Sequence, residues 1–135
     1  MTLFGPDHVE RYRATDGEEG YDWKGGTVIL LLTTTGRRSG EERTMPLIYQ
    51  PDGDRFVIVA SKGGWEDHPG WYYNLTENPN VEVQVKGDRF KAQASTAEGE
   101  ERERLWKLMA AAWPDYDEYQ TKTERQIPVV VLTRI

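Results

Sequence analysis

The 135-residue chain contains no cysteine. Disulfide scaffolds, thiolate metal sites and cysteine nucleophiles are therefore excluded, and the composition fits the reducing cytoplasm. Histidine is scarce as well, because only His8 and His68 occur and no ligand-like spacing joins them. Zinc sites rely on histidine and cysteine ligands, so we expect no metal centre. A G-x-S-x-G nucleophile elbow is also missing, which disfavours a serine hydrolase.

Long apolar runs and an excess of positive charge are missing too. The aliphatic stretch at residues 28–32 is far too short to span a bilayer, and the N-terminus lacks the basic and apolar regions of a signal peptide. The formal net charge is -6 and the sequence pI is about 5.0. Nucleic-acid binding depends on clustered positive charge. We therefore predict a cytoplasmic protein with no nucleic-acid partner and no integral membrane segment.

Strands joined by hairpins dominate the sequence pattern. The β-branched and leucine run at residues 27–34 is bounded by glycine and is typical of a buried strand. A second strand at residues 43–50 contains Pro46, which cannot donate to a strand ladder and therefore marks an edge or a bulge. A Pro-Asp-Gly-Asp turn leads into a return strand at residues 55–62. Alternating segments predict a second hairpin over residues 81–94, and the apolar C-terminus predicts a last strand.

Helices are expected between these strands. Aromatic and leucine positions predict a short helix over residues 68–79. An apolar stripe at i, i+3, i+4 and i+7 predicts an amphipathic helix that includes residues 105–112. Ser95 and Glu98 have the spacing of a capping box at its start. A second short helix or turn is predicted within residues 115–126.

The hairpins imply antiparallel pairing, because parallel strands need long crossovers. A small antiparallel sheet that hides its edges tends to close into a barrel. We therefore predict a mainly β protein with helical insertions, built as a β-barrel. Residues 1–26 are polar and glycine-rich, and we expect a flexible N-terminal lead-in that can order as a lid over a pocket. Residues 27–135 are expected to form a single domain.

A glycine-rich turn between the first two strands carries a cluster of arginines. The cluster consists of Arg37, Arg38 and Arg43. Its glycines allow backbone N–H groups to turn toward a ligand, Ser39 adds a hydroxyl, and guanidinium groups match phosphate and carboxylate. The alternative is a solvated hairpin in which two neighbouring glutamates neutralise two arginines.

A second segment favours the anion site. Residues 59–75, VASKGGWEDHPGWYYNL, combine a strand end, Lys62, a Gly-Gly turn and a helix start. Strand-end backbone groups and a helix N-terminus together suit a planar, anionic ligand. With the arginine turn, this segment predicts a cofactor groove.

Four blocks follow one another along the chain: TTTGRRSG…R, VASKGG, HPGWYYNL…NP and WPDYDEYQ…TER.IPVVVL. With these blocks, the sequence from about Trp23 to the C-terminus resembles the deazaflavin (coenzyme F420)-dependent nitroreductase and oxidoreductase family. The resemblance implies a split β-barrel related to flavin-mononucleotide-binding oxidoreductases. It also implies hydride transfer from reduced coenzyme F420 to an electron-poor small molecule, such as a quinone, an enone or a nitroaromatic. Two alternatives stay open: a flavin-mononucleotide-dependent oxidoreductase of the same fold, and a non-catalytic deazaflavin carrier. The chain is expected to act as a monomer or a weak homo-oligomer.

The resemblance also assigns residues to the site. It implies cofactor contacts for Arg37, Arg38, Ser39, Arg43, Val59, Ala60, Ser61, Lys62, Gly70, Trp71, Tyr72, Tyr73, Asn74 and Tyr116. Tyr116 matches an aromatic residue that closes over the ring on the substrate side. The proton is expected from solvent, Tyr116 or Ser61. The substrate pocket is expected to contain Ile48, Trp113 and Tyr119, and members that activate nitroimidazoles carry tyrosines at the first two positions, which leaves that activity in doubt.

Overall fold

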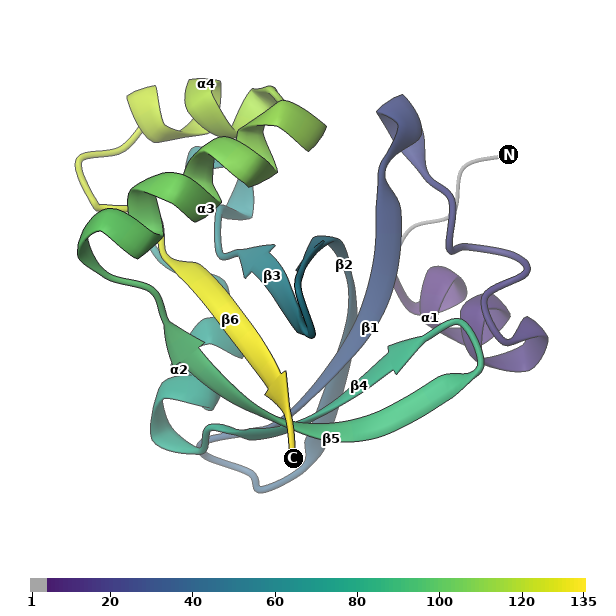
Figure 1. Ribbon diagram of the computed structural model, residues 1–135. Coiled ribbons are helices and arrows are strands. Elements are labelled where there is room, and N and C mark those ends of the chain that lie inside the picture. The colour runs from purple at the N-terminus through teal and green to yellow at the C-terminus, as the bar shows by residue number, and fades with distance from the viewer. Residues whose placement is uncertain (1–4) are drawn as a thin grey trace.

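A closed antiparallel barrel forms the body of the protein. The computed structural model describes residues 5–135, and its strands follow the order β1-β2-β3-β6-β5-β4 around the barrel (Figure 1). The strands are β1 (Val28–Thr35), β2 (Glu42–Asp52), β3 (Arg55–Val59), β4 (Asn80–Val85), β5 (Asp88–Thr96) and β6 (Val129–Arg134). The predicted mainly β barrel with helical insertions is confirmed.

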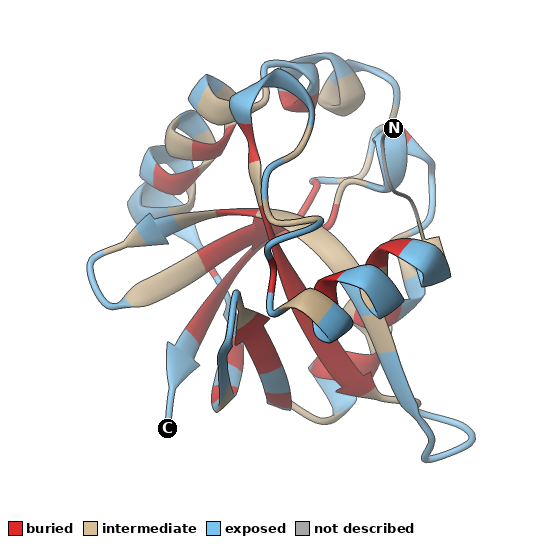
Figure 2. Ribbon diagram, turned by 90° about the vertical axis from the view of Figure 1, so that its right-hand side faces the viewer, coloured by how far each residue is buried: buried red, intermediate tan, exposed pale blue. Residues whose placement is uncertain are grey.

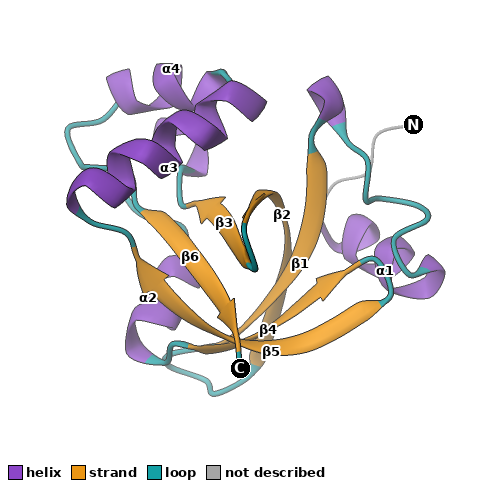
Figure 3. Cartoon of the chain, viewed as in Figure 1, coloured by secondary structure: helices purple, strands orange, loops and turns teal. Residues whose placement is uncertain are grey.

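The helices cover different parts of this barrel. They are α1 (Gly5–Thr15), α2 (Gly70–Glu77), α3 (Gly99–Ala112) and α4 (Asp115–Thr121), with short 3-10 helices η1 (Lys24–Gly26) and η2 (Lys62–Gly64). Helices α3 and α4 lie next to each other over one end, whereas α1 lies on another side, near the β4–β5 hairpin (Figure 3). Within the described residues, no helix is long and apolar enough to span a membrane.

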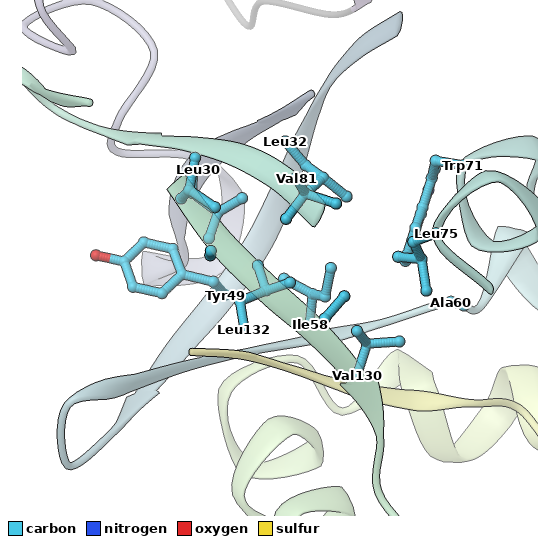
Figure 4. Close-up of a cluster of buried hydrophobic side chains, with 13 residues drawn as sticks. Leu30, Leu32, Tyr49, Ile58, Ala60, Trp71, Leu75, Val81, Val130 and Leu132 are labelled. Carbon is cyan, nitrogen blue, oxygen red and sulfur yellow. The ribbon is translucent and has the colours of Figure 1, made fainter. Parts of the chain in front are cut away.

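Apolar side chains from the strands fill the barrel. Leu30, Ile58 and Leu132 are fully buried, and they face one another across the interior (Figure 4). Trp71 and Leu75 of α2 join the same cluster, so this helix is held to the barrel by burial of its apolar face. Figure 2 shows buried positions concentrated in the strands and exposed positions on the outer helical faces.

Strand β2 leaves one edge unpaired. It pairs with β1 from Glu42 to Tyr49, but with β3 only from Gln50 to Asp52. Pro46 therefore lies where β2 has a neighbour on one side, which confirms the predicted edge. Beyond the three paired positions, β2 and β3 separate, and the cavities described below lie in that region.

Two local expectations were wrong. Ser95 does not begin a capping box, because β5 continues through Thr96 and pairs Ser95 with Val131 of β6. Helix α3 has Glu98 at its N-cap, without a side-chain cap. Strand β3 also stops at Val59, three residues earlier than expected, since the chain turns there into η2. In the first case closure of the barrel outweighs a local capping pattern.

Within the described part of the predicted lead-in, helix α1 packs on the barrel. Tyr12 of α1 is 0% exposed. Its hydroxyl donates to the carbonyl of Ile29 at 2.9 Å and accepts from the N–H of Lys86 at 2.7 Å. Burial raises the pKa of Tyr12 to about 12. The boundary at residue 26 stays a prediction, and residues 1–4 lie outside the described part.

We predict that Tyr12→Phe lowers the free energy of unfolding by about 1–3 kcal/mol, because it removes the partner of the buried Ile29 carbonyl and of the part-buried Lys86 N–H. Chemical denaturation measures the loss. Tyr72→Phe is the matched control, since the Tyr72 hydroxyl meets Thr96 Oγ1 in an exposed contact; its effect should stay within about 0.5 kcal/mol. Equal free energies of unfolding for the two variants would show that the hydrogen bonds of the Tyr12 hydroxyl do not stabilise the fold.

Candidate cofactor and substrate site

Two adjoining cavities lie where β2 and β3 separate. The first, of about 720 Å³, is called the arginine cavity and is lined by Gly36, Arg37, Arg38, Ser39, Arg43, Met45, Leu47, Val59, Ser61, Lys62, Pro69, Gly70, Trp71 and Asn74. The second, of about 310 Å³, is called the aromatic cavity and is lined by Gly5, His8, Trp23, Ile29, Met45, Pro46, Leu47, Ile48, Val59, Ser61, Gly63, Trp113, Tyr116 and Tyr119. Met45, Leu47, Val59 and Ser61 line both cavities, so these four residues form their common boundary.

The glycine turn folds differently from the predicted backbone cradle. The N–H of Gly36 donates to the Glu41 carbonyl at 2.7 Å, and the N–H of Gly40 donates to the Gly36 carbonyl at 2.8 Å. The hydroxyl of Ser39 accepts from the Glu41 N–H. A Cβ at Gly36 would lie 2.8 Å from Ser39 Oγ and 3.1 Å from the Glu41 carbonyl oxygen, so a larger residue would force the turn to shift. These two N–H groups serve the turn itself, and the positive charge in the lining belongs to side chains.

Arg37 is held in place by helix α2. The amide oxygen of Asn74 accepts from both the backbone N–H and Nη1 of Arg37, at 3.1 and 3.0 Å. Asn74 is 5% exposed and donates through Nδ2 to Thr34 Oγ1. The Arg37 guanidinium also lies 5.1 Å from the centre of the Tyr73 ring. These contacts fix the direction of one cation at the wall of the arginine cavity.

Arg38 and Arg43 are less constrained. Arg38 is exposed and has no hydrogen bond or ion pair within residues 5–135. Arg43 approaches Glu41 at 3.6 Å, but both side chains are largely exposed, so this pair is weak. The neutralised-hairpin alternative therefore applies to one arginine of the three. Lys62 adds a further cation to the lining.

Aromatic rings dominate the second cavity. Tyr116 is 4% exposed and lies 6.2 Å from the ring of Tyr119 in an edge-on arrangement. Trp113 donates through Nε1 to the Tyr119 hydroxyl at 3.4 Å. Ile48 contributes an aliphatic part of the wall. Burial, and secondarily the neighbouring Tyr119, raises the pKa of the Tyr116 hydroxyl, so this group keeps its proton at neutral pH.

Most, but not all, of the predicted site residues line a cavity. Ala60 is fully buried in the barrel core, where its side chain lines neither cavity. Tyr72 is also absent from both linings, and Tyr73 lies behind Arg37. The remaining predicted residues line the arginine cavity, the aromatic cavity or both. The predicted residues that line the arginine cavity and those that line the aromatic cavity thus come from distant parts of the chain and meet at one boundary.

Several residues of the site were missed in the sequence. Trp23 lines the aromatic cavity and its ring lies 5.8 Å from that of Trp113. His8 belongs to the same lining and binds the Gly20 carbonyl through Nε2 at 2.8 Å. Arg125, which lies within one of the quoted blocks, binds the loop after β3. An isolated aromatic residue and lone histidine in a polar segment give no periodic signal, so only the fold could reveal their place.

The η2 turn links both cavities to helix α4. Lys62, Gly63 and Gly64 have φ values of +46, +63 and +84°, three successive left-handed residues. Lys62 is not glycine, and left-handed backbone angles are disfavoured for a residue that carries a Cβ. A Cβ at Gly64 would lie 2.6 Å from the Tyr119 carbonyl oxygen. The turn therefore needs glycine at 64 to approach the helix that carries Tyr116 and Tyr119.

Comparison with known proteins agrees with this geometry. The family model for F420H(2)-dependent quinone reductase matches residues 6–134. An F420H(2)-dependent quinone reductase of Mycobacterium tuberculosis (strain H37Rv) is 44% identical over 130 residues, which cover 94% of this chain and 87% of that protein.

Solved structures are similar as well. An F420-H2 dependent reductase, FDR-A, is 48% identical over 77% of this chain and 92% of that chain, with a TM-score of 0.72. A domain-swapped dimer is 41% identical over 95% of this chain and 99% of that chain, with a TM-score of 0.75. The predicted split β-barrel of flavin-mononucleotide-binding oxidoreductases is thereby confirmed. On the family model and these relatives, the chain belongs to the F420H(2)-dependent quinone reductase family.

Proposed function

We propose that this protein reduces quinones, with reduced coenzyme F420 bound in the arginine cavity and the quinone in the aromatic cavity. The observation that carries the proposal is the shared boundary, where Met45, Leu47, Val59 and Ser61 line both cavities. A donor and an acceptor in adjoining cavities can meet without solvent between them, as transfer between two reactants requires.

The arginine cavity fits an anionic cofactor with a flat ring. Its volume of about 720 Å³ lies in the usual range for small-molecule sites. Arg37, Arg38 and Arg43 suit phosphate and carboxylate groups. Leu47 and Trp71 in the same lining provide apolar surface for a ring. The lining thus combines the positive charge and the apolar surface that such a ligand needs.

When bound, the reduced deazaflavin supplies the hydride, because the difficult chemistry belongs to the cofactor. A quinone that accepts one hydride and one proton becomes the hydroquinone. The protein residues orient the two rings and exclude water: Val59 and Ser61 separate the cavities, and Trp113 and Tyr119 provide aromatic surface for the acceptor. Ile48 belongs to the same wall and is proposed to favour flat quinones over nitroimidazoles.

Tyr116 and Ser61 are the proposed sources of the hydrogen bond to the acceptor oxygen. Because the pKa of Tyr116 is raised by burial, its hydroxyl donates a hydrogen bond and ionises poorly. The Ser61 side chain stands at the boundary of both cavities. The net proton then comes from solvent, with these hydroxyls stabilising charge that develops on the oxygen.

Other properties stay proposals for this chain. The flavin-mononucleotide alternative predicts a yellow purified protein, and the carrier alternative predicts binding of deazaflavin without its oxidation. Location in the cytoplasm and a monomeric or weakly homo-oligomeric state remain predictions from the sequence. One similar structure is a domain-swapped dimer, so the oligomeric state should be measured with the activity.

The central experiment follows the loss of reduced F420 absorbance with menadione, an enone lactone and a nitroimidazole in parallel. We expect the quinone to be reduced fastest, because a flat, electron-poor ring fits between the aromatic side chains. Stoichiometric formation of menadiol confirms that electrons reach the quinone. Tight binding of F420 without turnover of any acceptor would favour the carrier alternative, and a bound flavin would favour the flavin-mononucleotide alternative.

We predict that Arg38→Ala weakens F420 binding roughly ten- to hundredfold, the value of one charge-assisted contact. Stability should change by no more than about 0.5 kcal/mol, since Arg38 has no described partner to lose. Calorimetric titration at two salt concentrations measures the affinity, which should fall as salt rises. Arg89→Ala is the charge-matched control, because Arg89 is exposed and lies in neither cavity. Equal affinities for the two variants would remove the anion-site assignment.

We predict that Tyr116→Phe lowers kcat for menadione roughly tenfold, the loss of one hydrogen bond to the reacting oxygen. The dissociation constant of F420 should change less than kcat, because Tyr116 lines the aromatic cavity and not the arginine cavity. Because the pKa of Tyr116 is raised, wild type should show no inflection from this residue between about pH 6 and 9. Unchanged kcat in Tyr116→Phe would exclude the tyrosine and leave Ser61, tested as Ser61→Ala, or solvent.

A further inference from the structure

One side chain holds the loop that links β3 to α2. Arg125 donates from Nε to the Trp65 carbonyl at 2.8 Å, from Nη1 to the Ala60 carbonyl at 3.2 Å and from Nη2 to the Ser61 carbonyl at 2.7 Å. A guanidinium has five N–H donors in a planar fork, so it can bind several carbonyls at once. The loop is thus fixed from a segment more than 50 residues away in the chain.

His68 completes this contact set. Its Nδ1 lies 2.9 Å from Nη1 of Arg125. Arginine has no acceptor, so Nδ1 accepts the hydrogen bond, the ring proton is on Nε2, and the imidazole is neutral. The ring packs against Tyr72 and Tyr73, with ring centres at 4.8 and 5.5 Å. The position of His68 is therefore defined by α2 as well as by Arg125.

Protonation of His68 conflicts with this arrangement. A proton on Nδ1 would face an N–H of Arg125, and the two positive charges would repel. The charged and titratable groups around the ring are Arg125, Asp67 on the same loop, and the phenols of Tyr72 and Tyr73. Burial, followed by Arg125, lowers the pKa of His68, and Asp67 opposes the shift.

We propose that Arg125 is a positioning residue for the cofactor site and that His68 makes its hold on the loop dependent on pH. The loop supplies Ser61, Lys62 and Pro69 to the lining of the arginine cavity. Neutral His68 keeps these residues in the binding geometry, and protonated His68 releases the Arg125 fork. This inference rests on the proposed function, because it requires the arginine cavity to be the F420 site.

The sign of the effect follows from the neutral state. Binding is strongest above the ordinary pKa of histidine and weakens as pH falls through the lowered pKa of His68. One linked proton allows the dissociation constant to rise at most about tenfold per pH unit. Folding stability follows the same direction, because the native state resists the proton that the unfolded state accepts.

The test compares the pH dependence of F420 affinity in wild type and His68→Asn. Asparagine keeps an acceptor oxygen near the position of Nδ1 and does not titrate. Between about pH 7.5 and 5, we expect wild type to lose roughly tenfold more affinity than His68→Asn. Titration of the ligand itself is common to both proteins and cancels in this comparison. The same pH dependence in both proteins would overturn the proposal.

A second pair of variants separates positioning from general stability. Arg125→Lys keeps the charge and loses the fork, so we expect at least roughly tenfold weaker F420 binding at every pH. Arg102→Lys is the control, because Arg102 donates to the Ile127 carbonyl at 2.7 Å and lies in neither cavity. It should lower Tm without changing the affinity. Equal effects of both variants on affinity would contradict the positioning role.

Nitrogen chemical shifts of the two imidazoles provide a readout without cofactor. We expect His68 in the Nε2–H tautomer, titrating below the ordinary range of histidine, and an Nδ1–H tautomer would overturn the proposal. If wild-type protein binds F420 but shows no histidine-dependent pH effect, only this inference fails. If wild-type protein does not bind F420 at any pH, the assigned site fails and this inference fails with it.

Discussion

The separation of β2 from β3 is the constraint on which the rest of the site depends. The two strands pair at three positions and then diverge, while β3 continues to pair with β6 and so keeps the barrel closed. At this free edge, Arg43 of β2 lines only the arginine cavity, whereas Pro46 and Ile48 line only the aromatic cavity. Met45 and Leu47 line both cavities, so a single free strand forms part of the wall of each.

The acidic net charge is compatible with a local anion site because the arginines divide into two groups. Arg55 and Arg104 bind Asp52, and hydrogen bonds first from Arg104 and then from Arg55 hold the pKa of that carboxyl well below its usual range. These arginines join the β2–β3 turn to α3. Arg38, by contrast, has no partner within the described residues. A ligand therefore meets local positive charge that structural pairs have not already neutralised.

The sequence revealed the barrel and the arginine turn because both have local signals, namely alternating strands, turn residues and clustered cations. It could not reveal Arg125, whose partners are mainly backbone carbonyls 60 to 65 positions earlier and therefore have no residue-type signature. The packing of α1 was hidden for the same reason, since Tyr12 reaches Lys86, 74 positions away. The predicted capping box was wrong for a different reason: Ser95 has the local spacing of a helix cap, but it pairs with β6 as part of a strand.

The η2 turn couples the two cavities mechanically. Lys62 lines the arginine cavity, and its neighbour Gly63 lines the aromatic cavity. The next residue, Gly64, packs so closely on Tyr119 that a Cβ has no room. A packed turn of this kind has little freedom to move at one residue without moving at the next. Because Arg125 holds the start of this turn through the Ser61 carbonyl, one guanidinium outside either cavity lining supports the walls of both the arginine cavity and the aromatic cavity.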